Sequence, residues 1–554
     1  MRKTLHRALT VGLGRGRLLR WSAQLGVVAA VCLGSGCVTT GPLDWIQNGF
    51  KVGPNYARPP APVAEDWIDG QDPSVQKRQL EEWWTVFQDP RLNQLIETAY
   101  RQNVNLRVLG TRVLQARAQQ AIAAGNLFPQ TQQAEGQYSR VALSHNTFNN
   151  PAALSAIAAN LPGGIGSPPL VGNFFSDWTA GFNLSWELDF WGRFRRSIES
   201  ANANLDASVE NYDAALVTLL ADVATNYVQY RVAQQRIKIA RDNVRIQQGV
   251  VDLAEQRFRV GTTTRLDVEQ SRTILEQTRS TIPFLQIELG QANDRLCTLL
   301  GIPPSDLAPE LGEGTSLGAD PMANVPTWVA AGIPADLLRR RPDVRSADRQ
   351  VAAQSAEIGI AEADLYPTVA VNGTIGVEAA DLNKLFESKS FFGTITPGFR
   401  WNILNYGRIV NNVRLQDART QGQIAAYQNQ VLTAAQEVQT ALRGFLRSRE
   451  QADALSRSVT AAVGATQLGV EQYRRGTVSF TPVFQFQTSQ VTVQDQLAVA
   501  QGNVSLNLIN AYRALGGGWE IRCREPGGSR AQLTGIVPEA PSEELSPPRP
   551  IPQR

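Results

Sequence analysis

The chain has 554 residues, a net charge of +3 and a mean hydropathy of −0.22, and 43% of its residues are hydrophobic. Its two histidines, His6 and His145, leave catalytic triads and multi-histidine metal sites without their usual residues, so we expect no enzyme, no metal site and no cofactor. The basic residues form no block interleaved with aromatic residues, which argues against nucleic-acid binding. After the leader, no run approaches the roughly 18 apolar residues of a spanning helix, so any membrane crossing must use strands.

Residues 1–36 have the features of an export signal. Six Lys or Arg residues precede a short apolar run at 25–33, and no acidic residue appears before Asp44. The run ends in Gly34-Ser35-Gly36-Cys37, which resembles a lipobox, although Gly34 replaces the usual branched residue. We predict that Cys37 is acylated and is the mature N-terminus, with Val38 favouring sorting to the outer membrane. The alternatives are an ordinary signal peptide with an unmodified cysteine, or cleavage near Cys32.

The rest of the chain contains an internal repeat. Trp186–Gly192 (WELDFWG) matches Trp401–Gly407 (WNILNYG) at an offset of 215 residues (401 − 186). Leu127-Phe128-Pro129 matches Leu365-Tyr366-Pro367 at an offset of 238 (365 − 127). The difference of 23 (238 − 215) places an insertion in the first repeat, within the Asn-, Gly-, Pro- and Ser-rich stretch 144–173.

The segments before the long helices alternate apolar and polar residues, which predicts strands at about 128–142, 177–190, 367–378 and 391–404. Each is near the length of a membrane-spanning strand. A half-buried hairpin of a soluble protein is the alternative interpretation. Four strands cannot close a barrel, and open edges are not tolerated in lipid, so two or three chains must share one of 8 or 12 strands.

Each repeat then carries a long heptad pattern. Apolar residues recur every seven positions from Val209 to Phe258, and the seam shifted by 215 residues runs from 424 to 473. The pattern predicts coiled-coil helices of roughly 65 residues, about 100 Å long at 1.5 Å per residue. Shorter seams at 268–296 and 483–504 predict returning helices.

Gly261 and Gly476 are expected to end the outgoing helices in the left-handed conformation and to form the tips of two antiparallel hairpins, at about 194–300 and 408–515. The resulting division of the chain is a signal segment (1–36), an anchor segment (37–105), a first repeat (106–300), a linker (301–341), a second repeat (342–515) and a C-terminal segment (516–554) with a disordered Pro-rich tail from about 525.

Several short motifs resemble the outer membrane factor family of TolC-like channels, and within it the NodT/OprM type of efflux lipoprotein. They are 52–56 (VGPNY), the Trp83-Trp84 pair, the Gly-Ile-Pro at 332–334, 337–343 (LLRRRPD) and 365–367 (LYP). The resemblance runs from about residue 37 to residue 515, and together these motifs are specific.

The resemblance implies an α+β membrane protein, a homotrimer in which four strands per chain form a 12-stranded β-barrel in the outer membrane. It implies a 12-helix periplasmic α-barrel and a mixed equatorial domain formed around 45–105, 301–341 and 505–523. It also implies an exit duct for small molecules or drugs, coupled through a periplasmic adaptor protein to an inner-membrane efflux transporter. The rival functions are a duct of the same fold for protein secretion or metal efflux, and a structural coiled-coil periplasmic lipoprotein.

In this family, acidic, tyrosine and arginine residues close the tunnel at the hairpin tips. The matching gate candidates here are Asp267, Arg265, Tyr473, Arg474, Arg475, Phe484 and Gln485. Gln485 departs from the acid that is frequent there, so the acidic ring is expected to be weaker. The alternative for Asp267 is a solvated ion pair with Arg265 or Arg272.

Two further cysteines, Cys297 and Cys523, are both expected near the equatorial region. A disulfide between them is conceivable in an oxidising compartment. The alternative is that Cys297 is simply buried on a packed helix.

Overall fold

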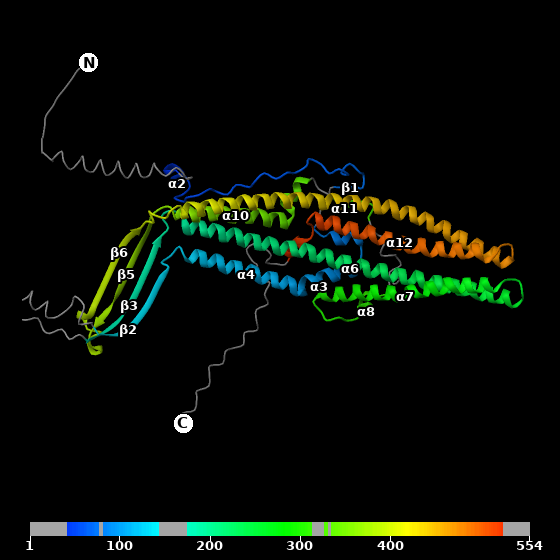
Figure 1. The fold of residues 1–554 in the computed structure, drawn as a ribbon, viewed down its shortest axis with the longest axis horizontal. Coiled ribbons are helices and arrows are strands. Elements are labelled where there is room, and N and C mark those ends of the chain that lie inside the picture. The colour runs from blue at the N-terminus through cyan, green and yellow to red at the C-terminus, as the bar shows by residue number, and fades with distance from the viewer. Residues whose placement is uncertain (1–40, 77–80, 143–173, 313–325, 331–333, 525–554) are drawn as a thin grey trace, which may run out of the picture. The chain divides into compact units, whose positions relative to one another are not determined.

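The computed structural model describes residues 41–76, 81–142, 174–312, 326–330 and 334–524 (Figure 1). The signal segment, Cys37, the insertion and the Pro-rich tail lie outside these residues. The chain divides into two compact units, one comprising 1–56, 123–199 and 355–418, the other 57–122, 200–354 and 419–554.

The first unit contains a four-stranded antiparallel sheet. Its strands are β2 (Thr131–Ala142), β3 (Phe174–Leu188), β5 (Thr368–Ala379) and β6 (Phe391–Arg400), in the order β2-β3-β5-β6. The central β3–β5 pair joins the two repeats, with Leu188 opposite Val369. The outer strands β2 and β6 each have one edge that no strand of the described chain covers (Figure 1).

The register gives this sheet one apolar and one polar face. Phe182 lies opposite Ile375, and the next pair on the other face is Asn183 with Thr374. Since side chains of directly opposed residues share a face, the alternation in each strand adds up across the sheet. Large apolar side chains on the first face are exposed, among them Phe182, Ile375, Ile395 and Phe399.

The strand ends differ from the expected ones by a few residues. β2 begins at Thr131 rather than 128, since Pro129 cannot donate to a ladder. β6 ends at Arg400 rather than 404, and residues 401–407 form an irregular turn. β3 begins three residues before the expected 177, at Phe174.

The second unit is mainly helical and is built from the long helices. They are α6 (Arg193–Arg259), α7 (Arg265–Leu300), α11 (Arg408–Arg475) and α12 (Phe480–Ala514), the first and third having 67 and 68 residues. None of the helices in the described ranges is both long enough and apolar enough to span a membrane.

Shorter elements complete the described chain. They are α2 (Pro42–Gln47), α3 (Pro90–Gln102), α4 (Val104–Gly125), α8 (Ala308–Leu311), α9 (Leu337–Arg340), α10 (Pro342–Ala363), the 3-10 helices η1 (Trp83–Phe87), η2 (Pro334–Asp336), η3 (Leu382–Lys384), η4 (Ser388–Ser390) and η5 (Trp519–Arg524), and the parallel pair β1 (Val75–Gln76) and β4 (Val329–Ala330).

Most heptad positions are buried, for example Leu216 and Val223 in α6 and Phe445 in α11. The last position predicted for the first seam is wrong, because Phe258 is 45% exposed. The seam position before it, Val251, is still buried, and so is Tyr473, the equivalent of Phe258 in the second repeat, so the departure is confined to the last turn of α6.

Cys297 and Cys523 are free thiols, so the conceivable disulfide between them is absent. Cys297 is fully buried in α7, and its thiol donates to the carbonyl oxygen of Ser305 at 3.4 Å. Burial on a packed helix therefore accounts for this cysteine.

Candidate functional site

The hairpin turns have the same backbone geometry in both repeats. Gly261 and Gly476 have φ values of 76° and 79°, which favour glycine. The Gly261 amide donates to Phe258 at 3.0 Å, and the Gly476 amide donates to Tyr473 at 3.0 Å. These bonds satisfy carbonyl groups that the end of each outgoing helix leaves open.

The side chains near the two turns differ. Tyr473 is 1% exposed and lies in an apolar cluster with Val250, Phe480 and Val483, its ring centroid 5.5 Å from that of Phe480. Burial raises the pKa of the Tyr473 phenol, so it stays protonated. Its repeat equivalent, Phe258, is 45% exposed. Tyr473 is thus packed within the second hairpin. Its carbonyl oxygen and hydroxyl are the atoms that contact the first hairpin.

Arg257 links the two hairpins and was not among the predicted site residues. Its guanidinium carbon lies 4.6 Å from the centre of the Tyr473 ring, and its Nη1 donates to the Tyr473 carbonyl oxygen. The repeat places Gln472 at the equivalent position (257 + 215). The two repeats therefore carry different residues at this position beside a predicted turn, and this difference was visible in the sequence.

Asp267 is held by the start of α7. Its carboxylate accepts hydrogen bonds from the hydroxyl groups of Thr263 and of Thr264, the latter at 3.2 Å. The Thr263 hydroxyl also lies 3.4 Å from the Tyr473 hydroxyl. Thr263 therefore connects Asp267 to Tyr473 within one chain.

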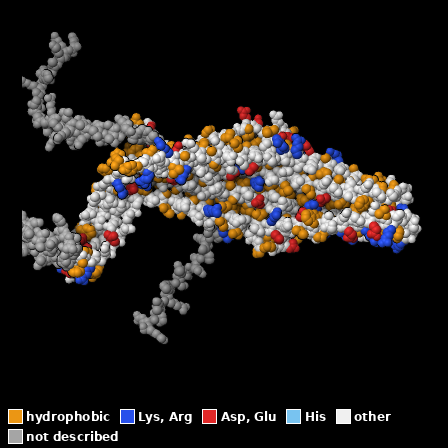
Figure 2. Space-filling view, viewed as in Figure 1, with side chains coloured by type: hydrophobic (Ala, Val, Ile, Leu, Met, Phe, Trp, Pro, Cys, Tyr) orange, Lys and Arg blue, Asp and Glu red, His pale blue; other side chains and the backbone are white. Residues whose placement is uncertain are grey.

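The alternative ion pairs for Asp267 are not formed. Arg265 lies 3.6 Å from Glu269, and Arg272 pairs with Glu255 at 2.7 Å. Figure 2 shows basic side chains gathered at the α6–α7 turn, where Arg265 is largely exposed.

The other gate candidates lie around the α11–α12 turn. Arg474 and Arg475 are exposed and pair with Glu471 of their own helix at 3.0 and 2.8 Å. Phe484 packs against the Tyr473 cluster, whereas Gln485 is exposed. Within one chain, Arg257 and Thr263 make the contacts between the hairpins, whereas Arg474 and Arg475 bond within their own helix.

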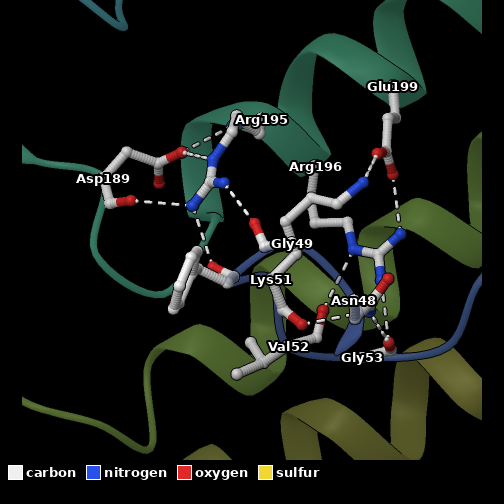
Figure 3. Close-up of polar contacts among 10 residues, drawn as sticks. Asn48, Gly49, Lys51, Val52, Gly53, Asp189, Arg195, Arg196 and Glu199 are labelled. Carbon is white, nitrogen blue, oxygen red and sulfur yellow. Dashed lines mark hydrogen bonds and ion pairs between the residues drawn. The ribbon is translucent and has the colours of Figure 1, made fainter. Parts of the chain in front are cut away.

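A second polar site lies where β3 passes into α6, and it holds the segment 48–53 (Figure 3). Arg196 is 2% exposed and donates to the carbonyl oxygens of Val52 at 3.0 Å and Gly53 at 2.8 Å. Its third partner is the Glu199 carboxylate at 2.7 Å, which also binds Lys51. The buried charge of Arg196 is thus neutralised and hydrogen-bonded.

Arg195 holds the same segment from the other side (Figure 3). It donates to the carbonyl oxygens of Gly49 at 2.6 Å and Phe50 at 2.8 Å, and to the Asp189 carboxylate at 2.8 Å. That carboxylate also accepts the backbone amide of Phe194 at 2.9 Å, so it caps the start of α6. We call this arrangement of Arg195, Arg196, Asp189 and Glu199 the arginine clamp. Sequence reasoning missed it because its partners are some 145 positions apart.

The aromatic residues of the first junction pack within the chain. Trp191 stacks on Tyr366 with ring centroids 4.5 Å apart, and its Nε1 donates to the Pro367 carbonyl oxygen at 2.8 Å. Trp45 of α2 lies against Trp191, with centroids 5.3 Å apart. The junction is therefore covered by the N-terminal segment and by the turn that leads into β5.

The second junction repeats part of this arrangement. Trp401 donates to the Leu365 carbonyl oxygen at 3.0 Å, as Trp186 donates to that of Leu127 at 3.3 Å. However, Tyr406, the equivalent of Trp191 (191 + 215), is 97% exposed.

The comparisons with known proteins agree on one family. The family described as outer membrane efflux protein matches residues 95–302 and 333–517. The pyoverdine export outer membrane protein OpmQ of Pseudomonas putida is 31% identical over 460 residues, which cover 81% of this chain and 91% of that protein. The probable outer membrane lipoprotein SilC of Salmonella typhimurium is 28% identical over 476 residues, covering 85% and 95%.

A solved structure of the outer-membrane channel OprN matches with a TM-score of 0.75 and 30% sequence identity. The match covers 85% of this chain and 99% of that chain. The likeness therefore extends over both repeats.

Proposed function

This chain belongs to the outer membrane efflux protein family, and we propose that it passes small molecules from an inner-membrane pump across the periplasm and the outer membrane. It is an outer-membrane efflux channel of a tripartite system. The observation that carries this function is the sheet with one apolar and one polar face, in a chain that also forms two long helical hairpins. The export of pyoverdine, named for OpmQ, supports small molecules over proteins as cargo.

We infer that the channel is a homotrimer. The open edges of β2 and β6 support an assembly of several copies, because unpaired backbone groups are not tolerated in lipid and four strands cannot close a barrel. The number three is what the resemblance to the family implies. Three copies give 12 strands in the membrane and 12 helices in the periplasmic tunnel. A periplasmic adaptor protein and an inner-membrane transporter complete the proposed system, and the duct itself performs no bond chemistry.

We also propose that Cys37 carries a lipid and anchors the chain in the outer membrane. The small residues before this cysteine support the proposal, as does the name lipoprotein given to SilC. Mass spectrometry of the N-terminal peptide should show an acylated Cys37. A mature N-terminus elsewhere, or an unmodified cysteine, would contradict it.

The gate is proposed at the hairpin tips. Asp267 contributes negative charge, and the link from Asp267 through Thr263 to Tyr473 holds the two hairpins of one chain together. Arg257 adds a second link, through the carbonyl oxygen of Tyr473. Without such links, six hairpins in a trimer would leave a permanently open hole.

Single-channel recording in planar bilayers tests this function. Asp267→Ala combined with Tyr473→Phe removes both ends of the link but keeps the buried aromatic ring, so assembly should be unaffected. We expect higher conductance and a weaker preference for cations, because an acidic ring at a constriction selects cations. Arg447→Gln is the matched control, since Arg447 is an exposed residue of α11 that pairs with Glu450 of its own helix and is not a gate candidate. An assembled double mutant with wild-type conductance and selectivity would place the gate elsewhere.

A further inference from the structure

The two halves of the sheet are related by the internal repeat, and this relation predicts which strand should pair with each open edge. In the centre, β3 of the first repeat pairs with β5 of the second. The same relation requires β6, the second strand of its repeat, to pair with a β2. The β2 of the same chain lies at the opposite edge, about 14 Å away across three strand spacings. Only a second copy of the chain can supply it.

A contact that already exists within the chain, in the turns beside β3 and β5, shows what the equivalent contact between two copies would be. Within the chain, Trp191 after β3 stacks on Tyr366 before β5 and donates to Pro367. The offset of 215 carries Trp191 to Tyr406, and the offset of 238 carries Tyr366 to Phe128 (366 − 238). Aromatic residues thus stand at both equivalent positions.

Both equivalent residues are exposed in the single chain. Tyr406 is 97% exposed and Phe128 is 66% exposed, whereas Trp191 and Tyr366 are half-buried. Tyr406 also has a φ of 50°, a positive value that Trp191 does not share, so the backbone of the single chain departs from the first junction at this residue. In the single chain, nearly all of the Tyr406 side chain is in solvent.

We propose that Tyr406 stacks on Phe128 of the partner subunit and donates its hydroxyl to the carbonyl oxygen of the partner subunit's Pro129. This contact repeats between subunits the Trp191–Tyr366 contact within each chain, and it fixes the neighbour on which β6 closes. The inference rests on the proposed channel assembly.

Cysteine cross-linking tests the contact. The variant carries Tyr406→Cys and Phe128→Cys, with Cys523→Ser removing the exposed native thiol. After membrane extraction and treatment with a short bifunctional thiol reagent, denaturing gels should show two and three linked chains. The matched control pairs Tyr406→Cys with Tyr138→Cys, an exposed position farther along β2, and should give no linked chains.

Native mass spectrometry of the same sample separates the two levels of the proposal. An oligomer whose chains fail to link, or link only within themselves, overturns the Tyr406 contact and leaves the channel assembly standing. A monomer in the membrane extract overturns both.

A thermodynamic cycle provides a second test that needs no cross-link. Tyr406→Ala and Phe128→Ala should each lower the temperature at which the oligomer dissociates, and the double variant should lower it no further than the stronger single change. Effects that add fully would overturn the contact. Tyr406→Phe should retain most of the wild-type value, because it keeps the ring.

Discussion

The two sheet–helix junctions share one sequence pattern, but other residues of the chain cover the first junction and leave the second exposed. At the first, the arginine clamp and Trp45 cover the turn after β3 with the chain's own N-terminal segment. At the second, Val410 and Asn411 stand where the repeat has Arg195 and Arg196, and Tyr406 is exposed. The repeat therefore preserves the left-handed glycines Gly192 and Gly407 but not the backbone of the residue before them, and the side chains decide what covers each turn.

The hairpin tips show the same division. Both turns have a left-handed glycine with equal hydrogen bonds, yet Tyr473 is buried and its equivalent Phe258 is exposed. The two repeats thus share local backbone features but not side-chain contacts. We expect neighbouring copies to cover residues that are buried in one repeat and exposed in the other.

Removal of the clamp's buried arginine should have the largest effect. Arg196→Ala removes the donor to the Val52 carbonyl oxygen and one of the donors to that of Gly53, which keeps its bond from Asn48. It also leaves Glu199 with Lys51 alone, so we expect a loss of about 3 kcal/mol in the free energy of unfolding. Asn411→Ala, at the equivalent position of the second repeat, should change it by less than about 0.5 kcal/mol. Denaturant unfolding in detergent measures both. Equal losses would erase the difference between the junctions.

A pair of glycines in the clamped segment gives the next largest effect. Both Gly53 and Gly49 have positive φ values, 83° and 65°. A Cβ on Gly53 would lie 2.4 Å from the Cα of Gly359, whereas one on Gly49 would meet nothing within 4 Å. Gly49→Ala should therefore cost about 1 kcal/mol of unfolding free energy, from backbone strain alone. Gly53→Ala should cost clearly more, and an equal cost for both would contradict the close approach.

Acid should loosen the first junction and spare the second. Burial alone would raise the pKa of Glu199, but its bonds to Lys51 and Arg196 outweigh burial and hold that pKa below its usual value. Its stabilising effect is therefore present above the ordinary pKa of 4.5 and is lost as the pH falls through the lower folded value.

Pepsin cleavage within 41–53, measured relative to an unstructured peptide at the same pH, should thus increase sharply at low pH in the wild type. Glu199→Gln should be cleaved at a rate that varies less with pH. Arg414→Gln, at the equivalent position of the second repeat, should behave like the wild type. A pH response retained in Glu199→Gln would exclude this carboxylate as its source.

Making the second junction resemble the first should have the smallest effect. Tyr406→Trp places at 406 the residue found at 191, so the oligomer should dissociate at the same temperature or a few degrees higher. Asn402→Ala, an exposed control in the same turn, should leave this temperature unchanged. A large drop for Tyr406→Trp would mean that the second junction does not share the template of the first.

Local features of this fold were readable from the sequence. The heptads gave long helices whose buried positions include Leu216 and Phe445, and glycine after such a helix indicates a left-handed end. Contacts between distant segments were not readable. Arg196 looks like any helix residue until Val52 and Gly53 reach it, and the burial of Tyr473 depends on Val250 in another helix.

The exposure of Tyr406 in the assembled protein tests the central claim most directly. Hydroxyl-radical footprinting in native outer-membrane vesicles reports side-chain exposure through the oxidation rates of Tyr406 and Trp191. We expect Tyr406 to be oxidised about as slowly as Trp191 in the wild type, and much faster in Phe128→Ala, with Trp191 unchanged. Oxidation of Tyr406 in the wild-type assembly at the rate of a free tyrosine would show that no neighbouring copy covers the second junction.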